Sequence, residues 1–427
     1  MKGKKTIQKT TEAIQKQQER VVVLGWNYST ALGMVRSVGM AGFVVDLYYI
    51  SKNKTNIRTI LGSKYIHRSF VHAEWDDLPI IEELLSAYDG HQGKIVLLPS
   101  DDYTSSLLDR YYDQLSRQFL MPHIGKGEQG AITRFMDKTI QAELGKTHGL
   151  NVMGYTKIYI PEDGQVTIPD HVEYPCFVKP IASLQGRKKD MRRCDTPEQL
   201  LKTLNRIYKK RGGGRTVIAQ QYVEISEEYS ISGLALGDMV FLPALLRRLY
   251  TGKSERGVTI VGKLVEISEV VDFKDKLVSL IQSLHFSGLF SFDLVRSSDT
   301  VYFSEINFRS AGSLYGYVRA GANLPAILLD FLLKGNKPTS PPVVKMGTTF
   351  FYDKVGWEDL MNGYCTKKEF SHYQVISDFS LMKDDLDPKP GIILYKALRK
   401  KFWLDRHFPK LKKMYKGIKH FINGKGS

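Results

Sequence analysis

The stretch from Phe292 to Ser313 places four chemically active side chains inside predicted β-strands. Its sequence, FDLVRSSDTVYFSEINFRSAGS, has β-forming residues on both sides of a polar turn, which is typical of a β-hairpin. Strands that only packed a core would carry Val or Ile at these positions. The chain instead has two carboxylates, an amide and a guanidinium, on Asp293, Glu305, Asn307 and Arg309.

The hairpin predicts a site for a divalent cation. Glu305, Asn307 and Arg309 share one face, because alternate residues of a strand point the same way. A three-residue loop at 298–300 would pair Asp293 with Glu305, about 5 Å apart, and two such carboxylates repel each other unless a cation lies between them. Oxygen ligands without His or Cys suit Mg²⁺, which completes its shell with water and phosphate oxygens. We therefore expect Mg²⁺ and a nucleoside triphosphate here; the alternative is an exposed hairpin face with a solvated Glu–Arg pair.

Two lysines favour the triphosphate. Lys179 lies in FVKP at the end of an apolar strand, where a buried charge is costly unless it meets an anion. Lys138 follows Asp137, the predicted N-cap of a helix that ends at Gly149, and helix N-termini attract anions. Each lysine taken alone is more often structural or solvated. With the hairpin, they supply the two cations and two carboxylates that are needed to hold MgATP.

The elements around these residues predict an α/β protein. VVVLG, FVVDLYYI and KIVLLPS are short apolar runs separated by helical stretches, which favours a doubly wound parallel sheet. VVVLGWNYSTALG and the later Asp46 partly match a dinucleotide fingerprint, but Trp26 and Asn27 occupy positions where the pyrophosphate must approach. We expect a Rossmann-like structural domain here rather than an NAD site. Further along, VIAQQYV, EYSISGLAL and MVFLPALLRRL predict an antiparallel meander.

The order of these motifs resembles the ATP-grasp superfamily, which includes biotin carboxylase, carbamoyl-phosphate synthetase and D-alanine–D-alanine ligase. The resemblance runs from about Val21 to Leu333, and the hairpin with its E-x-N-x-R motif is its most specific part. It implies an α/β (α+β) fold with an N-terminal Rossmann-like domain and a two-lobed ATP-grasp domain. The matching segments are MDK (136–138), FVKP (177–180), VIAQQYVEISEEYSI (217–231) and FDL…SEINFRSAGS (292–313).

The predicted domain limits follow from these motifs and from the Pro-rich stretch at 336–344. We expect five segments along the chain, the last of them a basic helical tail. They are a polar leader (1–20), the Rossmann-like pre-ATP-grasp domain (21–125), the N-terminal lobe (126–215), the C-terminal lobe (216–338), and a linker with the basic tail (339–427).

The resemblance also implies which residues would bind ATP. Lys138 and Lys179 would contact its phosphates, and Glu228 would bind the ribose hydroxyls. The family's phosphate-covering loop is usually rich in glycine; here it reads IASLQGRKKDMRRC, and Gly186 is its only glycine. Its basic residues could equally bind an acidic substrate. Adenine would be contacted by main-chain groups of four consecutive residues: Gln220, Gln221, Tyr222 and Val223.

The metal ligands and catalytic residues are implied in the same way. Mg²⁺, usually as two ions and replaceable by Mn²⁺, would be held by Asp293, Glu305 and Asn307. Arg309 would face the reacting acyl phosphate. Several basic residues between the meander and the next helix are candidates for binding the carboxylate substrate, and Arg247 is the one that we pair with Arg309. Surface charge explains Arg247 equally well.

The net charge of +16 is mostly a property of the C-terminal tail. Residues 391–427 carry eleven Lys or Arg against one acid, Asp405. Apolar residues between Leu411 and Ile422 fall on one helical face with lysines opposite, which is typical of an amphipathic basic helix. This pattern predicts contact with an anionic membrane surface or an acidic partner; the alternative is a terminal helix docked on the body. Nucleic acid is not expected, since no aromatic-and-basic module of a known kind is present.

Cysteine usage and hydropathy predict the compartment. Cys176, Cys194 and Cys365 are scattered and match neither a disulfide framework nor a zinc spacing, which favours a reducing cytoplasm. No apolar run approaches the length of a membrane span. We expect a cytoplasmic protein, peripheral at the inner membrane surface if its tail binds lipid.

These observations predict an ATP-dependent ligase that resembles the single-chain carboxylate–amine ligases, a group that includes D-aspartate ligases. A substrate carboxylate would attack the γ-phosphate to give an acyl phosphate and ADP, and an amine would then displace phosphate to form an amide. The substrates would be small or peptide-like acids and amines. One alternative is a small-molecule kinase with the same fold. The other is a binding protein whose nucleotide site is structural and which acts through its basic tail.

Overall fold

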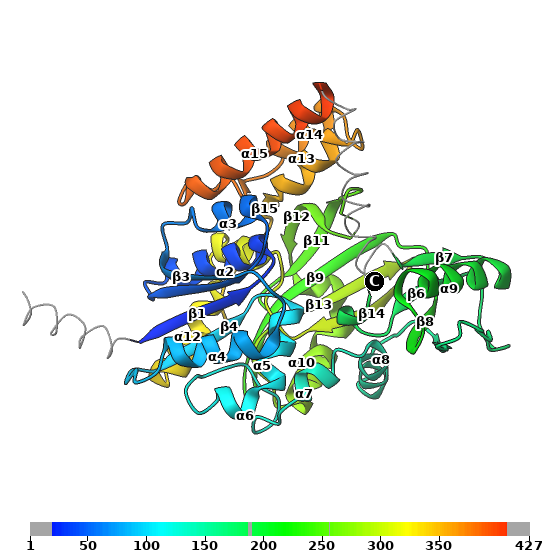
Figure 1. Cartoon of the computed structure of the whole chain (residues 1–427), viewed down its shortest axis with the longest axis horizontal. Coiled ribbons are helices and arrows are strands. Elements are labelled where there is room, and N and C mark those ends of the chain that lie inside the picture. The colour runs from blue at the N-terminus through cyan, green and yellow to red at the C-terminus, as the bar shows by residue number, and fades with distance from the viewer. Residues whose placement is uncertain (1–18, 187–189, 256, 408–427) are drawn as a thin grey trace, which may run out of the picture.

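The computed structural model describes residues 19–186, 190–255 and 257–407, and these residues form three β-sheets (Figure 1). The first sheet is parallel, in the order β3-β2-β1-β4. Its strands alternate between two cores: Val21 and Val23 pack with α2, whereas Val22 and Leu24 pack with α4 and α5. Helices therefore cover both faces, which is why the strands read as continuous apolar runs. The elements of this part are β1 (Arg20–Gly25), α2 (Tyr28–Met40), β2 (Val45–Ile50), α3 (Lys54–Ile60), β3 (Ile66–His72), α4 (Asp77–Ala87), β4 (Ile95–Pro99), α5 (Asp102–Arg110), α6 (Tyr112–Leu115) and α7 (Ala131–Arg134).

The predicted Rossmann-like sheet is confirmed, although the sequence pattern missed β3, α3 and α4. β3 is an edge strand with no fully buried residue; half-buried and exposed side chains alternate along its sequence, IHRSFVH, which contains the polar run His67–Arg68–Ser69. A pattern search for continuous apolar runs does not detect such a strand.

The second sheet is small and antiparallel, in the order β5-β8-β6-β7. It contains β8, which the sequence pattern assigned to the following meander. The predicted boundary between residues 215 and 216 is therefore wrong: Ala219 of β8 pairs with Val178 of β6 and packs in the same core. The elements of this lobe are α8 (Lys138–Thr147), β5 (Tyr155–Ile160), β6 (Cys176–Pro180), the 3₁₀ turn η1 (Ser183–Gln185), β7 (Arg192–Cys194), α9 (Pro197–Arg211) and β8 (Arg215–Gln221).

The third sheet has eight strands, in the order β14-β13-β9-β11-β12-β15-β16, with β10 paired to β9. The β13–β14 hairpin therefore lies at one end of the sheet, and β14 is an edge strand. The elements of this lobe are β9 (Glu227–Leu236), β10 (Met239–Phe241), β11 (Leu245–Thr251), β12 (Thr259–Val265), η3 (Ile267–Phe273), α10 (Lys274–Ser283), β13 (Ser287–Ser297), β14 (Thr300–Asn307), α11 (Leu314–Arg319) and α12 (Leu324–Lys334).

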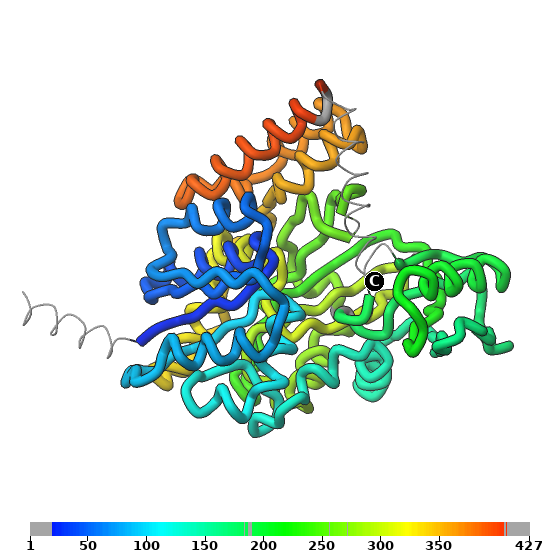
Figure 2. The backbone as a smooth tube through the Cα atoms, viewed as in Figure 1, coloured from blue at the N-terminus to red at the C-terminus, as the bar shows by residue number. Residues whose placement is uncertain are grey.

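The segment after residue 338 is part of the folded body, so its prediction as a linker and tail is wrong for residues 349–407. β15 (Thr349–Phe351) pairs with β12 in the third sheet. The helix α15 (Pro388–His407) lies beside α3 of the first domain (Figure 2), and its Leu394 and Leu398 enter the core built around β1. The other elements are α13 (Asp353–Met361), α14 (Lys367–Val375) and β16 (Phe379–Ser380).

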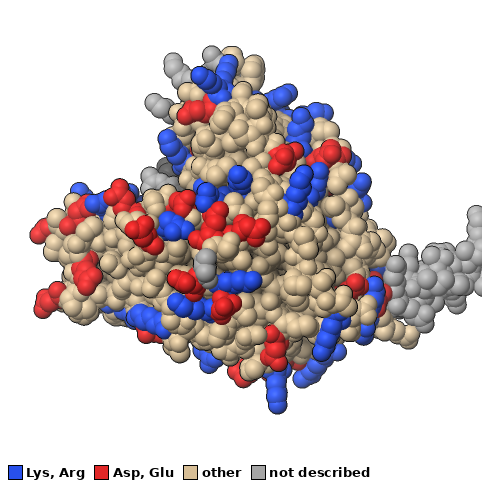
Figure 3. Space-filling view, turned by 180° about the vertical axis from the view of Figure 1, so that it is seen from behind, with Lys and Arg blue, Asp and Glu red and all other residues tan. Residues whose placement is uncertain are grey.

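The predicted amphipathic helix between Leu411 and Ile422 lies outside the described residues. Contact of 391–427 with an anionic surface therefore stays a prediction. Seen from behind, acidic and basic side chains are interspersed over the body (Figure 3). In the part of the chain that the structure describes, no helix is both long and apolar enough to cross a membrane.

A buried ion pair fixes the C-terminal segment to the first domain. Arg36 of α2 is fully buried and donates from Nε to Oδ2 of Asp387 at 2.9 Å and from Nη1 to the carbonyl of Leu381 at 2.7 Å. Asp387 also accepts from the Ser63 hydroxyl at 2.8 Å. The C-terminal helices and the Rossmann-like domain therefore share a charged contact as well as a hydrophobic core.

Replacing Arg36 by Ala is expected to lower the free energy of unfolding by about 3–5 kcal/mol, because it leaves Asp387 buried without its cation. Urea denaturation followed by circular dichroism measures this loss. The matched control is Lys52→Ala, which removes an ion pair whose two side chains are 62% and 64% exposed and should cost less than about 1 kcal/mol. Equal losses for the two variants would contradict the structural role of Arg36.

Candidate active site

The β13–β14 hairpin brings the two predicted metal-binding carboxylates together. Asp293 lies opposite Glu305, as the sequence predicted. The connecting loop is different, however: it has two residues, Ser298 and Asp299, instead of three. Ser298 has a φ of 51°, and two-residue hairpin turns require such positive values.

A β-bulge in β14 reconciles the shorter loop with the predicted pair. Leu294 pairs with Phe303 and Asp293 with Glu305, so Ser304 is the extra residue. The extra residue shifts the pairing of the two strands by one position from this point onward. Asp293 therefore lies opposite Glu305 instead of Ser304. The spacing of the apolar residues changes from two to three at this point, a signal that the sequence already contained. The apolar residues that show it are Val301, Phe303, Ile306 and Phe308.

Lys138, the first residue of α8, contacts Glu305, with 2.8 Å between Nζ and Oε2. As predicted, Asp137 is the N-cap of this helix and accepts hydrogen bonds from its first turn. Gln141 fixes the helix against the edge of β14: its amide donates to the carbonyl of Ile306 at 2.8 Å and accepts from the N–H of the same residue at 3.0 Å. Because Ile306 follows Glu305, this contact holds Lys138 beside the carboxylate.

The electrostatics of this pair keep both groups charged. The Lys138 ammonium lowers the pKa of Glu305 far below its usual range, against the opposing effect of burial. Burial by itself would lower the pKa of Lys138, but Glu305 outweighs it and the pKa is raised. The site therefore has a carboxylate that remains ionised although it is buried.

Lys179 lies on β6 and donates from Nζ to Oε1 of Gln220, on the neighbouring β8, at 2.7 Å. The strand end is tied to α8, since the N–H of Lys138 donates to the carbonyl of Ile181 at 2.8 Å. Burial lowers the pKa of Lys179 to about 8; Glu305 opposes this shift and the Lys138 ammonium adds to it. The two predicted phosphate-binding lysines are thus close enough for their charges to interact.

The pKa of Lys179 predicts how ATP use depends on pH. If the ammonium holds a phosphate, kcat/KM for ATP should fall about tenfold per pH unit above pH 8, because deprotonation removes the cation from the free enzyme. Initial rates of ADP release at low ATP between pH 6 and pH 10 measure this profile. Lys179→Arg should move the fall to higher pH, since a guanidinium stays protonated throughout this range. A profile that is flat to pH 10 in the parent chain would contradict the assignment.

Arg248, rather than Arg247, lies at the carboxylates. On β11 the two side chains point to opposite faces. Arg248 donates from Nη2 to Oδ1 of Asp293 at 2.5 Å, and its Nη1 is 3.7 Å from Oε2 of Glu228. Arg247 instead contacts Glu269 on the other face. The prediction of Arg247 beside Arg309 is therefore wrong, because the sequence did not show which neighbour faces the site.

Arg309 links the hairpin to the Rossmann-like domain. Its Nε donates to Oδ1 of Asp102, the first residue of α5, at 2.7 Å. Next to it, Ser105 of α5 donates from its hydroxyl to the carbonyl of Phe308 at 2.8 Å. The guanidinium is thus held at the junction of the two domains, on the segment that follows the predicted metal ligand Asn307.

Two main-chain N–H groups in the segment predicted to contact adenine already donate hydrogen bonds within the protein. The N–H of Gln221 donates to the carbonyl of Gly154 at 2.7 Å, and that of Tyr222 donates to the carbonyl of Pro175 at 3.0 Å. The Gln220 side chain accepts from Lys179. Adenine binding by the segment from Gln220 to Val223 stays a prediction, but it cannot use these two N–H groups.

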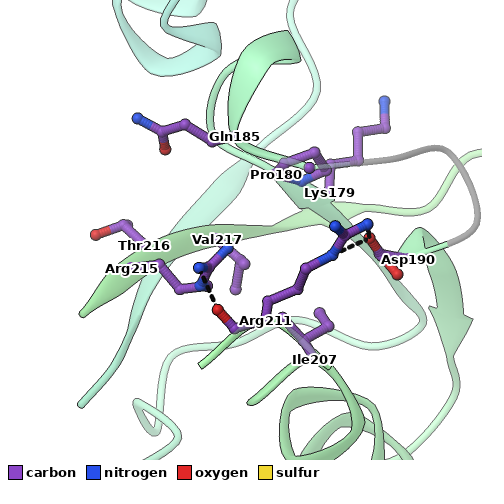
Figure 4. Close-up of a pocket in the computed structure, with 10 residues that line it drawn as sticks. Lys179, Pro180, Gln185, Asp190, Ile207, Arg211, Arg215, Thr216 and Val217 are labelled. Carbon is purple, nitrogen blue, oxygen red and sulfur yellow. Dashed lines mark hydrogen bonds and ion pairs between the residues drawn. The ribbon is translucent and has the colours of Figure 1, made fainter. Parts of the chain in front are cut away.

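Gly186 and Lys179 are among the residues that line a small pocket, which Figure 4 shows. A Cβ atom added at Gly186 would lie 2.6 Å from the Cβ of Pro180, which is too close. The glycine therefore permits a close approach of the loop to β6. Figure 4 shows the Lys179 side chain pointing away from the Arg211–Asp190 ion pair, which is 2.8 Å long. The basic residues 187–189 of the loop lie outside the described residues, so the role of the loop is untested.

The arrangement suits a magnesium-bound triphosphate. Asp293 and Glu305 each have a cationic partner, Arg248 and Lys138, so this end of the hairpin stabilises positive charge. In the described part of the chain, no three His, Cys, Asp or Glu side chains are grouped to hold a metal ion by themselves. The two carboxylates and the Asn307 amide fit Mg²⁺ that takes its other ligands from water and phosphate oxygens. Cations and carboxylates of this kind bind and polarise phosphoryl groups.

Comparison with known proteins shows similarity at the level of structure. No family model matches the sequence, and no curated protein matches it. The structure matches N5-carboxyaminoimidazole synthetase from Staphylococcus aureus with a TM-score of 0.60 at 15% identity, over 82% of this chain and 86% of that chain. It matches an L-amino acid ligase from Bacillus licheniformis with a TM-score of 0.55 at 14% identity, over 77% and 75% of the two chains. A third match is the biotin carboxylase domain of the Hydrogenobacter thermophilus 2-oxoglutarate carboxylase, solved with MgADP and bicarbonate, with a TM-score of 0.59 at 13% identity over 77% and 73%.

Proposed function

This chain has the ATP-grasp fold, and on that premise we propose that it is an ATP-dependent ligase that joins a carboxylate to an amine. It would form an acyl phosphate and then an amide, and release ADP and phosphate. The observation that carries the proposal is the pairing of Asp293 with Glu305, each beside a basic side chain from another element. An L-amino acid ligase with the same fold supports it.

We assign the residues that would hold MgATP as follows. Mg²⁺, held by Asp293, Glu305 and Asn307, would supply neutralising charge for the transferring phosphoryl group. Lys138 and Lys179 would bind phosphate oxygens. Arg248 donates to Asp293, so its guanidinium lies where it would bind a phosphate oxygen beside the metal. A similar biotin carboxylase domain with bound MgADP supports this choice of nucleotide and metal.

The proposed reaction has two bond exchanges. First, a substrate carboxylate oxygen attacks the γ-phosphorus, and the bond from that phosphorus to the bridging oxygen of ADP breaks. Then the amine nitrogen attacks the acyl carbon, phosphate leaves and the nitrogen loses a proton. Arg309, held by Asp102, would stabilise the oxyanion that forms on the acyl oxygen. Positioning and charge stabilisation supply most of the rate in such a site.

The experiment that tests the proposal is incubation of the full chain with MgATP, a set of carboxylic acids and hydroxylamine. A ligase gives ADP and a hydroxamate, because hydroxylamine traps the acyl phosphate. ADP with a stable phosphorylated product indicates a kinase instead. Absence of ADP release with every acid would overturn the proposal and favour a nucleotide-binding protein.

A further inference from the structure

Three aromatic side chains form an exposed cluster at the carboxyl edge of the parallel sheet. Trp26 follows β1, Trp75 precedes α4, and Tyr103 lies in the first turn of α5. The Trp26 and Trp75 rings are 5.3 Å apart and the Trp75 and Tyr103 rings 4.8 Å apart, both edge-to-face. Although they contact each other, Trp26 remains 42% exposed and Trp75 49% exposed. Contacts within the protein therefore leave a large apolar surface in water.

The cluster is fixed in position. The N–H of Trp26 donates to Oδ2 of Asp101 at 2.9 Å, and the Tyr103 hydroxyl donates to Oδ1 of Asp77 at 2.9 Å. Trp75 packs between these two anchored residues. Aromatic side chains that already contact one another have less conformational entropy to lose when they bind a ligand, so the cluster is suited to recognition.

The cluster adjoins the candidate active site. β1 and β4 are neighbours in the order β3-β2-β1-β4, where the chain reverses direction across the sheet, and ligands of such sheets bind outside the carboxyl ends of the strands at this point. Tyr103 is the residue after Asp102, the partner of Arg309. Since α5 lies between the parallel sheet and the hairpin (Figure 1), one helix turn carries both the aromatic ring and the carboxylate that positions the guanidinium.

Three carboxylates near the cluster have partners, whereas Asp76, beside Trp75, is exposed and makes no capping hydrogen bond. Asp77 accepts from Tyr103 and pairs with Arg110 at 2.9 Å, and Asp102 pairs with Arg309. Glu74, next to Trp75, pairs with Lys52 at 2.6 Å. The aromatic surface thus has three paired carboxylates and the exposed Asp76 around it, which favours an uncharged ring over an anionic group.

We propose that Trp26, Trp75 and Tyr103 form a subsite for an uncharged aromatic ring on the carboxylate substrate. This proposal rests on the proposed function, because the ring belongs to the carboxylic acid whose acyl group would react beside Arg309. The acid would place its carboxylate at Arg309 and its ring against the indoles. The class of substrate is an aromatic carboxylic acid or an amino acid with an aromatic side chain.

The test compares acids of different chemistry in the hydroxamate assay. L-Phenylalanine and 4-hydroxybenzoate represent aromatic rings, L-alanine a small side chain, L-glutamate a charge, and D-glucuronate a sugar ring. We expect the aromatic acids to have the highest kcat/KM. Trp75→Ala should raise their KM about tenfold with little change in the KM for ATP, and Trp75→Phe should restore most of the loss. Trp403→Ala is the matched control, because Trp403 is 52% exposed and lies on α15.

Preference for glutamate or glucuronate, or an unchanged KM in Trp75→Ala, would overturn the subsite while leaving the ligase proposal intact. If no acid releases ADP, the ligase proposal fails, and binding is then measured by saturation-transfer NMR on the ring protons of the two aromatic acids. Transfer that Trp75→Ala abolishes and Trp403→Ala retains would support the subsite without the reaction. Lack of transfer in the parent chain would overturn it.

Discussion

Glu305→Gln is expected to lower ADP formation about a thousandfold. The substitution keeps the shape of the side chain but removes a charge that lies opposite Asp293 and 2.8 Å from Lys138. The proposed metal site would lose an anionic ligand, and the largely buried Lys138 would lose the carboxylate that raises its pKa. Both losses act on the phosphoryl group as it transfers, so we expect the effect mainly in kcat. Coupled measurement of ADP under saturating MgATP checks it.

The matched control for this variant is Glu143→Gln. Glu143 also pairs with a lysine of α8, Lys146, at 2.9 Å, but its side chain is 58% exposed and lies on the outside of the helix. It should leave ADP formation within a factor of two. Circular dichroism of both variants separates loss of activity from loss of fold. A folded Glu305→Gln variant with near-normal turnover would disprove the assignment of the carboxylate pair.

Lys179→Ala should reduce kcat/KM for ATP by a factor on the order of 100–1000. The ammonium is partly buried at the end of β6, where it donates to Gln220 at 2.7 Å and lies 5.7 Å from the centre of the Phe177 ring. A neutral amide compensates a buried charge poorly, so the lysine should bind a phosphate strongly. Its removal takes away that contact and leaves Gln220 with an unused acceptor. Initial rates over a range of ATP concentrations give kcat and KM separately.

Lys202→Ala serves as the control for Lys179→Ala, because Lys202 is an exposed residue on α9 of the same lobe. It should change neither parameter. Lys179→Arg should retain part of the activity if charge is what matters. Equal ATP kinetics for Lys179→Ala and Lys202→Ala would show that the phosphates are bound elsewhere.

Local sequence patterns were sufficient to predict much of the fold. The apolar runs of β1, β2 and β4 predict a buried parallel sheet, because strands covered on both faces need apolar residues at every position. Asp137 followed by Lys138 predicts a capped helix, since capping depends on neighbouring residues alone. The pairing of Asp293 with Glu305 was predicted correctly with the wrong loop, because the bulge at Ser304 compensated for the missing loop residue.

Local sequence patterns did not predict contacts between segments that are distant along the chain. β8 joined the small sheet, and α15 packed against α3, because each buries its apolar face on a surface formed by other elements. In the sequence, Trp26 was notable only because it departs from a glycine motif. In the structure it forms a cluster with two aromatic residues from other parts of the chain.

The sequence by itself determined which chemical groups the site contains and their order along the chain. The tertiary structure alone decided which of them meet. Side chains alternate along a strand, so the choice between Arg247 and Arg248 depends on register, and register is set by the pairing of β11 with β9 and β12. Lys138 reaches Glu305, 167 residues later, because Gln141 binds the edge of β14. The charges are encoded locally, whereas their distances come from long-range packing.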